Sequence, residues 1–340
     1  MDIASTAATP AALLRVLAGG WITQAVYISA KLGVADLLQA QPRSCNSLAE
    51  CTRTHPHALY RVLRALASVG IFHEDENRCF RLTPMAEHLR TDAPGSLRAF
   101  AIMLGEREHW RAWEGLMHSV QTGNCAFEQV FGMPHFEYFE RHPESGRVFD
   151  AAMTSRSGSE NQAIIAAYDF ANARTVVEVG GGQGSLLEAI LRINREARGV
   201  LFDLAQVIAS ARNRMEEAEQ STRCEFVAGD FFTAVPSGGD LYVLKKVIHD
   251  WDDERATVIL SNCRRAMTAA GRLLLIEPVV PEGNDPSFSK LLDLLMLVWT
   301  SGGLERTRAE HEALLSAAGF KLRRVIPTHV AVDLLEAVLA

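Results

Sequence analysis

The stretch from Thr175 to Ser185, which reads Thr-Val-Val-Glu-Val-Gly-Gly-Gly-Gln-Gly-Ser, constrains the fold more than any other part of the chain. Its first half is rich in β-branched valine, which is typical of a buried parallel strand. Four glycines then fall within five positions, and glycine adopts backbone angles that other residues avoid and lets a ligand approach the main chain. Helical spacing follows Ser185. The pattern therefore predicts a strand, a glycine turn and a helix whose free amides favour an anionic group.

The glycine spacing leaves the identity of that group open. A dinucleotide fingerprint requires G-x-G-x-x-G. Gly180 and Gly182 match its first two glycines, but the third would fall on Ser185. The spacing present here, G-x-G-x-G, suits S-adenosylmethionine at least as well, and a tight turn without a ligand is a further interpretation. Because four glycines in five positions exceed what a simple turn requires, we expect a ligand.

The composition limits the class of protein. The 340 residues favour two domains, and 48% hydrophobic with 22% charged residues are ordinary for a soluble globular protein. A net charge of -7 without a long basic run argues against a nucleic-acid partner. The six cysteines form no C-x-x-C pair, so neither a zinc site nor a disulfide framework is predicted. We recognise no signal peptide and no membrane-spanning segment, and therefore expect a cytoplasmic protein without a membrane partner.

The first half of the chain reads as mostly helical. Residues 11–40 have helical periodicity, and residues 44–90 resemble a winged helix. Its expected elements are a helix capped by Ser47 and Glu50, a helix over residues 56–69, and wing strands over residues 71–72 and 79–82. Residues 96–170 are expected to be helical and rich in aromatic side chains, most of them core and some able to line an apolar pocket.

A winged helix can bind DNA, so the positive charges of this segment bear on whether DNA is its partner. Arg53 precedes the second helix, and Arg61 and Arg64 lie on its exposed side. On a net acidic chain, three arginines more often form a solvated face than a DNA-binding surface. The segment can equally serve as a dimerisation element.

From Thr175 onward, predicted strands and helices alternate. The strands cover residues 175–180, 199–203, 224–228, 240–245, 272–278, 321–327 and 330–338. The helices cover residues 185–194, 205–218, 254–268, 287–298 and 307–318, the last of them opened by a capping box of Thr307 and Glu310. This alternation predicts an open, mostly parallel sheet with helices on both faces. Ligands bind such sheets at the carboxyl ends of the strands.

Two of the predicted strands end in residues suited to an adenosine. Asp203 ends the second strand about 20 residues past the glycines, where an acid can accept both ribose hydroxyls. Asp230 and Phe231 follow the third strand, where they can contact the adenine amino group and stack on the base. Core packing is an equally good interpretation of Phe231 taken alone.

The fourth strand leads to His249, which lies beside an acid and a tryptophan and is a candidate general base. Glu277 ends the fifth strand, and Glu305 lies in a later loop that we expect near the same edge of the sheet. Two acids can orient the imidazole and hold its tautomer, which leaves the far nitrogen free to accept a proton. A lone histidine is usually structural, but its position on the ligand-binding edge favours a functional role.

Seven motifs, in this order and spacing, resemble the bacterial and plant small-molecule O-methyltransferases, which include the caffeic acid and hydroxyindole enzymes and bacterial natural-product tailoring enzymes. They are Glu178–Gly184, Phe202–Leu204, Gly229–Phe232, Leu244–Asp253, Ile276–Pro278, Leu292–Met296 and Gly302–Thr307. The likeness runs from about residue 11 to the end of the chain. It implies a Rossmann-like class I methyltransferase sheet, mostly parallel with seven strands. It also implies an N-terminal, mostly helical winged-helix dimerisation domain, with the domains expected over residues 1–160 and 161–340.

The resemblance implies an enzyme that moves a methyl group from S-adenosylmethionine to a hydroxyl, expected to be phenolic, of a small aromatic natural product. The product would be S-adenosylhomocysteine, no metal is expected, and the enzyme would be a homodimer. His249 would be the base, flanked by Glu277 and Glu305. The implied cofactor contacts are Gly180, Gly182, Asp203, Asp230, Phe231, Lys245, Ser157 and Trp251. The implied substrate contacts are Phe149, Met153, Asp250, Met296 and Thr300.

The chain departs from the family pattern at three positions. Glu178 stands where the family usually has Asp, Thr300 where plant members have Asn, and Arg156 where they have His. The last two argue against a phenylpropanoid substrate. Two alternatives are a protein of the same fold that hydroxylates or decarboxylates, which the retained histidine and acids oppose, and a winged-helix regulator that senses a ligand. A nicotinamide dehydrogenase is disfavoured by Ser185.

Overall fold

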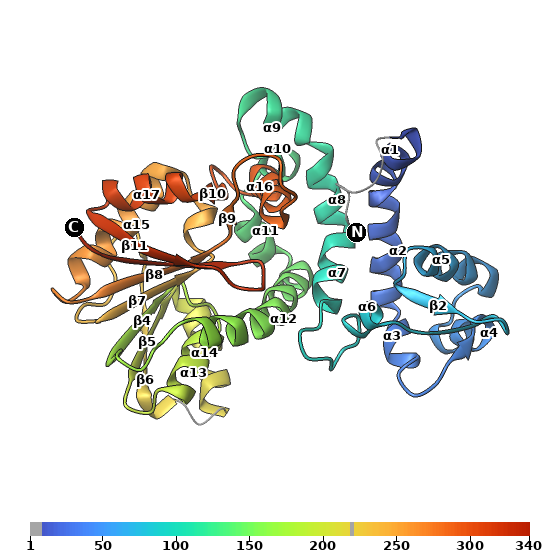
Figure 1. Cartoon of the computed structure of the whole chain (residues 1–340), viewed down its shortest axis with the longest axis horizontal. Coiled ribbons are helices and arrows are strands. Elements are labelled where there is room, and N and C mark those ends of the chain that lie inside the picture. Colours follow the sequence, from blue (N-terminus) through green and yellow to red (C-terminus); the bar gives the residue numbers. More distant parts are fainter. Residues whose placement is uncertain (1–8, 218–220) are drawn as a thin grey trace. The chain divides into compact units, whose positions relative to one another are not determined.

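The structure, a computed structural model, describes residues 9–217 and 221–340, which divide into two compact units (Figure 1). The first unit comprises the described residues up to Glu114 together with Phe136–Gly158. The second comprises Gly115–His135 and Ser159–Ala340. The expected domains cover residues 1–160 and 161–340. The structure instead groups residues 115–135, which lie before the expected boundary, with the second unit.

The first unit is mostly helical. Its elements are α1 (Pro10–Leu17), α2 (Gly19–Lys31), α3 (Val34–Leu37), β1 (Arg43–Ser44), α4 (Cys45–Thr52), α5 (Pro56–Ser68), β2 (Phe72–Glu74), β3 (Cys79–Leu82), α6 (Pro84–Glu87), α7 (Arg98–Gly105), α8 (Arg107–Glu114), α11 (His135–Arg141) and the first part of α12 (Pro143–Ala167). Buried apolar side chains of α3, α4, α5 and the strands form its core. The expected winged-helix arrangement of helices and a short hairpin is therefore present.

Two local predictions in the winged helix need correction. The helix expected to be capped by Ser47 begins earlier, at Cys45, because the side chain of Ser44 accepts the Ser47 amide and is its true N-cap. The two expected wing strands are present as the antiparallel pair β2 and β3, and the sequence missed a third strand, β1, which pairs with the other side of β3. The turn of the wing is held by Asp75, whose carboxylate accepts the amides of Asn77 and Cys79.

The second unit is built on a seven-stranded sheet. Its elements are α9 (Leu116–Thr122), α10 (Ala126–Phe131), β4 (Thr175–Val179), α13 (Ser185–Ile193), β5 (Arg198–Asp203), α14 (Ala205–Glu217), the 3₁₀ helix η1 (Ser221–Arg223), β6 (Cys224–Ala228), β7 (Leu241–Lys245), the 3₁₀ helix η2 (Ile248–Asp250), α15 (Asp253–Ala266), β8 (Arg272–Glu277), β9 (Val279–Val280), α16 (Phe288–Trp299), β10 (Arg306–Thr307), α17 (Arg308–Ala317), β11 (Phe320–Ile326) and β12 (Asp333–Leu339). The strand order is β11-β12-β8-β7-β4-β5-β6, and β12 runs antiparallel to both of its neighbours. The mostly parallel, seven-stranded prediction is confirmed.

Helices cover both faces of this sheet, with α15 and α17 on one face and α13 and α14 on the other (Figure 1). Alternate valines of β4 enter the two cores: Val177 and Val179 pack with α15, and Val176 packs with α13. A strand that is apolar on both sides belongs in the centre of a parallel sheet, which is where β4 lies.

Residues 115–135 group with the second unit because they pack on α16. The Cys125 thiol donates to the Val298 carbonyl over 3.3 Å. The Phe127 ring lies 5.2 Å from the Trp299 ring. Among the described residues no single helix is long and apolar enough to cross a membrane, although α1 and α2, bent by 41°, pass that test together.

Candidate active site

The glycine turn after β4 brings the main chain close to neighbouring side chains. Gly180 has a φ of +67°, and a Cβ there would meet a Val247 methyl carbon at 2.8 Å, so the turn requires glycine at this position. Gly182 donates its amide to Asp203 Oδ2 over 2.8 Å. The turn is thus fastened to the end of β5, and Gly184 is the N-cap of α13, which follows immediately.

Two acids and an aromatic ring lie at the next strand ends. The Asp203 carboxylate also accepts the Leu204 amide over 2.7 Å, and burial raises the pKa of this carboxyl group. Asp230 accepts the Phe232 amide over 2.8 Å. The Phe231 ring packs near Trp251, with ring centroids 6.1 Å apart, and would contact a Cβ at Gly180. The carboxyl ends of β4, β5, β6 and β7 therefore share one edge.

A polar network at the end of β7 was not found from the sequence. Lys245 Nζ donates to Asn161 Oδ1 over 2.8 Å and lies 3.3 Å from Glu160 Oε2. The ammonium group of Lys246, a residue with a φ of +53°, pairs with the other oxygen of Glu160. Both Glu160 and Asn161 are buried. The one signal in the sequence that could have indicated this network was the adjacent polar pair Glu160 and Asn161 in the middle of a predicted helix.

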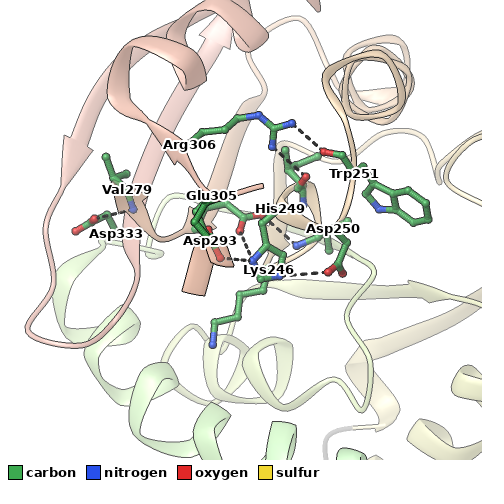
Figure 2. Close-up of polar contacts among 12 residues, drawn as sticks. Lys246, His249, Asp250, Trp251, Val279, Asp293, Glu305, Arg306 and Asp333 are labelled. Carbon is green, nitrogen blue, oxygen red and sulfur yellow. Dashed lines mark hydrogen bonds and ion pairs between the residues drawn. The ribbon is translucent and has the colours of Figure 1, made fainter. Parts of the chain in front are cut away.

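The turn after β7 carries His249, whose side chain is buried. Its Nδ1 lies 2.8 Å from Glu305 Oε1, while its Nε2 lies 3.7 Å from Asp250 Oδ1 (Figure 2). Nδ1 also lies 3.9 Å from Glu277 Oε2. Because a carboxylate only accepts, Nδ1 donates to Glu305 and the lone pair of the neutral ring stays on Nε2. Glu277 is itself fixed, since its Oε1 accepts the amides of Val247 and Ile248 over 3.1 and 2.9 Å.

This acidic setting controls the ionisation of the imidazole. Burial alone lowers the pKa of His249, but the charges of Asp250, Glu277 and Glu305 outweigh burial and raise the pKa to about 9. Burial raises the pKa of Glu277 to about 7 and also raises the pKa of Asp250. The donor atoms of His249, Glu277 and Glu305 lie within 4.8 Å of one another, a spacing that a metal ion also accepts. The short Nδ1 contact makes the arrangement a hydrogen-bonded cluster of one imidazole and buried carboxyl groups.

The helix α16 forms the wall of this cluster. Asp293 Oδ1 accepts the amide of Glu305 over 2.9 Å and so fixes the end of the loop that carries that acid. Met296 and Thr300 are buried, and the Thr300 hydroxyl donates to the Met296 carbonyl over 2.8 Å. Trp299 packs with Phe127 and His135. The role of Asp293 was missed, although a lone acid inside an apolar run was a usable signal.

The remaining residues implied by the resemblance belong to the first unit. Phe149, Met153 and Ser157 lie on α12 before the boundary at Gly158. Phe149 stacks on Phe139 with ring centroids 4.8 Å apart, and the Arg156 guanidinium lies 4.7 Å from the Phe100 ring centroid. The second unit by itself brings together the side chains of His249, Asp250, Glu277 and Glu305. It also holds the glycine turn and the residues at the neighbouring strand ends, Asp203, Asp230, Phe231 and Lys245.

Comparison with known proteins defines the class. Residues 113–321 match the O-methyltransferase domain, and residues 14–92 match the O-methyltransferase dimerisation domain. The chain belongs to this O-methyltransferase family and is an S-adenosylmethionine-dependent methyltransferase.

Three relatives illustrate the likeness. The phenazine O-methyltransferase PhzM of Lysobacter antibioticus is 48% identical over 325 residues, covering 96% of this chain and 95% of that one. CalO1, a methyltransferase of calicheamicin biosynthesis solved with S-adenosylhomocysteine, is 38% identical with a TM-score of 0.88, covering 97% of each chain. NcsB1, solved with S-adenosylmethionine and 2-hydroxy-5-methyl naphthoic acid, is 33% identical with a TM-score of 0.78, covering 94% of this chain and 96% of that one.

Glu178, which departs from the usual Asp, lies buried under the glycine turn. Its Oε2 accepts the Leu187 amide of α13 over 3.2 Å. Burial raises the pKa of this carboxyl group from 4.5 to about 7. Its contribution to stability is therefore fully present below about pH 4.5 and is lost as the pH rises through about 7.

The substitution Glu178→Gln should remove this loss because the amide keeps the shape and still accepts from Leu187. The gain in melting temperature relative to wild type should be larger near pH 8 than near pH 5, since a shift of one pKa unit corresponds to about 1.4 kcal/mol. Thermal unfolding at the two pH values measures it. Glu225→Gln, at an exposed position on β6, is the control, and its change in melting temperature should be the same at both pH values. Equal effects of Glu178→Gln at both pH values would contradict the assignment.

Proposed function

We propose that this enzyme methylates a phenolic hydroxyl of a small, flat aromatic natural product, with His249 as the general base. The observation that carries the proposal is the 2.8 Å contact between His249 Nδ1 and Glu305 Oε1 in a buried setting. A carboxylate on Nδ1 fixes the ring and its tautomer, so that Nε2 accepts the proton. Glu277, held by two backbone amides, adds a second negative charge on the same side of the ring.

S-adenosylmethionine supplies a sulfonium methyl group that is already activated for transfer. The main task of the protein is to align the accepting oxygen with the methyl carbon and the sulfur, and such positioning contributes on the order of 7–11 kcal/mol. His249 Nε2 takes the hydroxyl proton as the oxygen–carbon bond forms and the carbon–sulfur bond breaks. A base with a pKa of about 9 is well matched to a phenol near 10.

The residues at the strand ends fit the donor. In the proposal, Asp203 accepts the ribose hydroxyls, Asp230 and Phe231 contact the adenine, and Gly180 and Gly182 let the donor approach the main chain. Lys245, Ser157 and Trp251 complete the proposed contacts. Both glycines are consistent with a ligand at the turn. A side chain at Gly180 would occupy the space beside Val247 and Phe231, which glycine leaves to the ligand. At Gly182 the space around the main chain is already open, since a Cβ there would meet no atom within 4 Å.

Aromatic and sulfur side chains favour a flat acceptor. Met296 is buried on α16, the same helix that carries Trp299 of the Phe127–Trp299 ring pair, and methionine and aromatic surfaces suit planar apolar molecules. The names of the relatives, a phenazine enzyme and a naphthoate-bound enzyme, support the same class. The proposal includes Phe149, Met153, Asp250 and Thr300 as acceptor contacts.

A homodimer formed through residues 14–92 is also part of the proposal. Those residues match the family's dimerisation domain. Apolar side chains are exposed on and beside its first helices, including Leu17 at 66% and Trp21 at 79% of their surface. Several exposed apolar side chains in one short segment favour an interface.

His249→Gln should lower turnover by about 10²–10⁴-fold because it removes the proton acceptor while keeping a similar volume. Binding of S-adenosylhomocysteine, measured by calorimetry, should stay near the wild-type value. His329→Gln, at an exposed position in the same unit, is the matched control and should retain full turnover. Wild-type turnover in His249→Gln would remove this histidine from the base role.

The pH profile tests the ionisation of the same residue. The imidazole must be neutral to accept a proton, so kcat/KM should rise with pH and level off above a midpoint near 9. Glu305→Gln removes a charge that favours the imidazolium, and its midpoint should fall. Initial rates between roughly pH 6 and 10 measure both midpoints. An unchanged midpoint in Glu305→Gln would show that the Glu305 charge does not control the ionisation of His249.

A panel of acceptors tests the substrate class. Hydroxyphenazines and hydroxynaphthoates should be methylated, with one CH₂ added to the mass and the new methyl on oxygen by NMR, and a phenylpropanoid such as caffeic acid should be a poor acceptor. Methylation on nitrogen would contradict the proposed hydroxyl acceptor. Gain of an oxygen atom or loss of carbon dioxide would instead support the alternative chemistry on this fold.

A further inference from the structure

Arg306 lies directly after Glu305, and its side chain is only 1% exposed. The guanidinium donates from Nη1 to the Ile248 carbonyl over 3.2 Å and from Nη2 to the Trp251 carbonyl over 2.8 Å. Nε and Nη2 also donate to Asp253 Oδ1 over 2.9 and 2.8 Å. These contacts span the turn that carries His249, from one side to the other (Figure 2).

A buried guanidinium loses its hydration, so its partners must compensate. Its carboxylate partner, the Asp253 side chain, is 75% exposed, and an exposed carboxylate is screened by solvent. The two main-chain carbonyls are therefore the partners that account for the burial. Because the planar fork of arginine fixes the directions of its donors, it holds two carbonyls in one geometry, which the single ammonium of lysine does not reproduce.

Other contacts fasten the same two segments together. The Leu304 amide donates to the His249 carbonyl over 2.9 Å. A Cβ at Gly303 would lie 2.6 Å from that same carbonyl oxygen, so the loop approaches the turn as closely as a chain can. Residues on both sides of Glu305 therefore bind the main chain on both sides of His249.

Arg306 also has a fixed backbone. Together with Thr307 it forms β10, which pairs in parallel with β9, with Arg306 opposite Val279. The strand β9 begins two residues after Glu277, the second acid beside the imidazole. The backbone of Arg306 is thus fixed by pairing with β9, the strand that follows Glu277. Its side chain in turn holds the turn of His249.

We propose that Arg306 is a positioning residue for catalysis: its guanidinium holds the turn Ile248–Trp251 against Glu305 and thereby sets the contact between His249 Nδ1 and the Glu305 carboxylate. Arg306 does not contact the substrate in this proposal. The inference rests on the proposed role of His249 as the base. The charged groups that face the imidazole are Asp250, Glu277 and Glu305, with Arg306 behind the turn.

The experiment compares Arg306→Lys, which keeps the charge, and Arg306→Gln with the control Arg308→Gln. Arg308 is an exposed arginine two residues along the chain that pairs with Glu312. For each protein we would measure kcat, KM for S-adenosylmethionine, the melting temperature, and the titration midpoint of His249 by NMR. The His249 resonance is identified by its absence in His249→Gln.

Both Arg306 variants should lose about 10²-fold in kcat with little change in KM for the methyl donor, as expected for a misplacement of about 1 Å. The His249 midpoint should fall by about one pH unit as its contact with Glu305 lengthens. Arg308→Gln should match the wild type in all four measurements. If Arg306→Gln does not fold, Arg306→Lys decides.

A His249 midpoint and a kcat equal to wild type in Arg306→Lys would overturn the proposal. So would a lower melting temperature with an unchanged midpoint, because that result defines a purely structural arginine. The NMR titration needs no turnover. Activity in His249→Gln would contradict the proposed base. The effect of Arg306 on the imidazole would still be tested separately, by the NMR midpoint of His249 in the Arg306 variants.

Discussion

The hydrogen bond between His249 and Glu305 is the interaction on which the rest of the candidate site depends. The two residues are 56 positions apart in the sequence, yet Nδ1 and Oε1 lie 2.8 Å apart with both side chains buried. In a setting of low dielectric, such a contact is stronger than in water, but it requires its surroundings to hold both partners. The amide of Glu305 is fixed by Asp293 on α16, and the turn of His249 is fixed by Glu277 at the end of β8.

Gathering several ionisable groups in one buried place works against stability. Burial raises the pKa of Glu277 and of Asp250, which means that their charged forms are disfavoured there. The sheet compensates for this cost with two apolar cores, one on each face, to which β4 contributes alternate valines. The buried ionisable groups thus lie at the strand ends, where the cores stop and polar backbone is available to fix the charges.

Much of the fold follows from local patterns. The strand β4 covers Thr175–Val179, within a residue of its expected bounds, because valine repeats and a glycine run mark both of its ends. The capping box of Thr307 and Glu310 is present. The box expected at Ser47 is not, since Ser44, three residues earlier, reaches the Ser47 amide first. The grouping of residues 115–135 with the second unit had no local signal, because it depends on packing against α16, more than 150 residues later.

The sequence alone determined the architecture and the edge of the sheet at which the candidate site residues were expected to gather. It did so because helix and strand periods are local and parallel strands present their carboxyl ends together, so His249, Glu277 and Glu305 were expected as neighbours. Only the tertiary structure decided that Glu305, rather than Glu277, makes the short contact with the imidazole. It also decided that Arg306 is buried against the carbonyls of the His249 turn. Such choices depend on differences of about 1 Å between segments distant in the chain, and no local pattern of residues specifies distances of that kind.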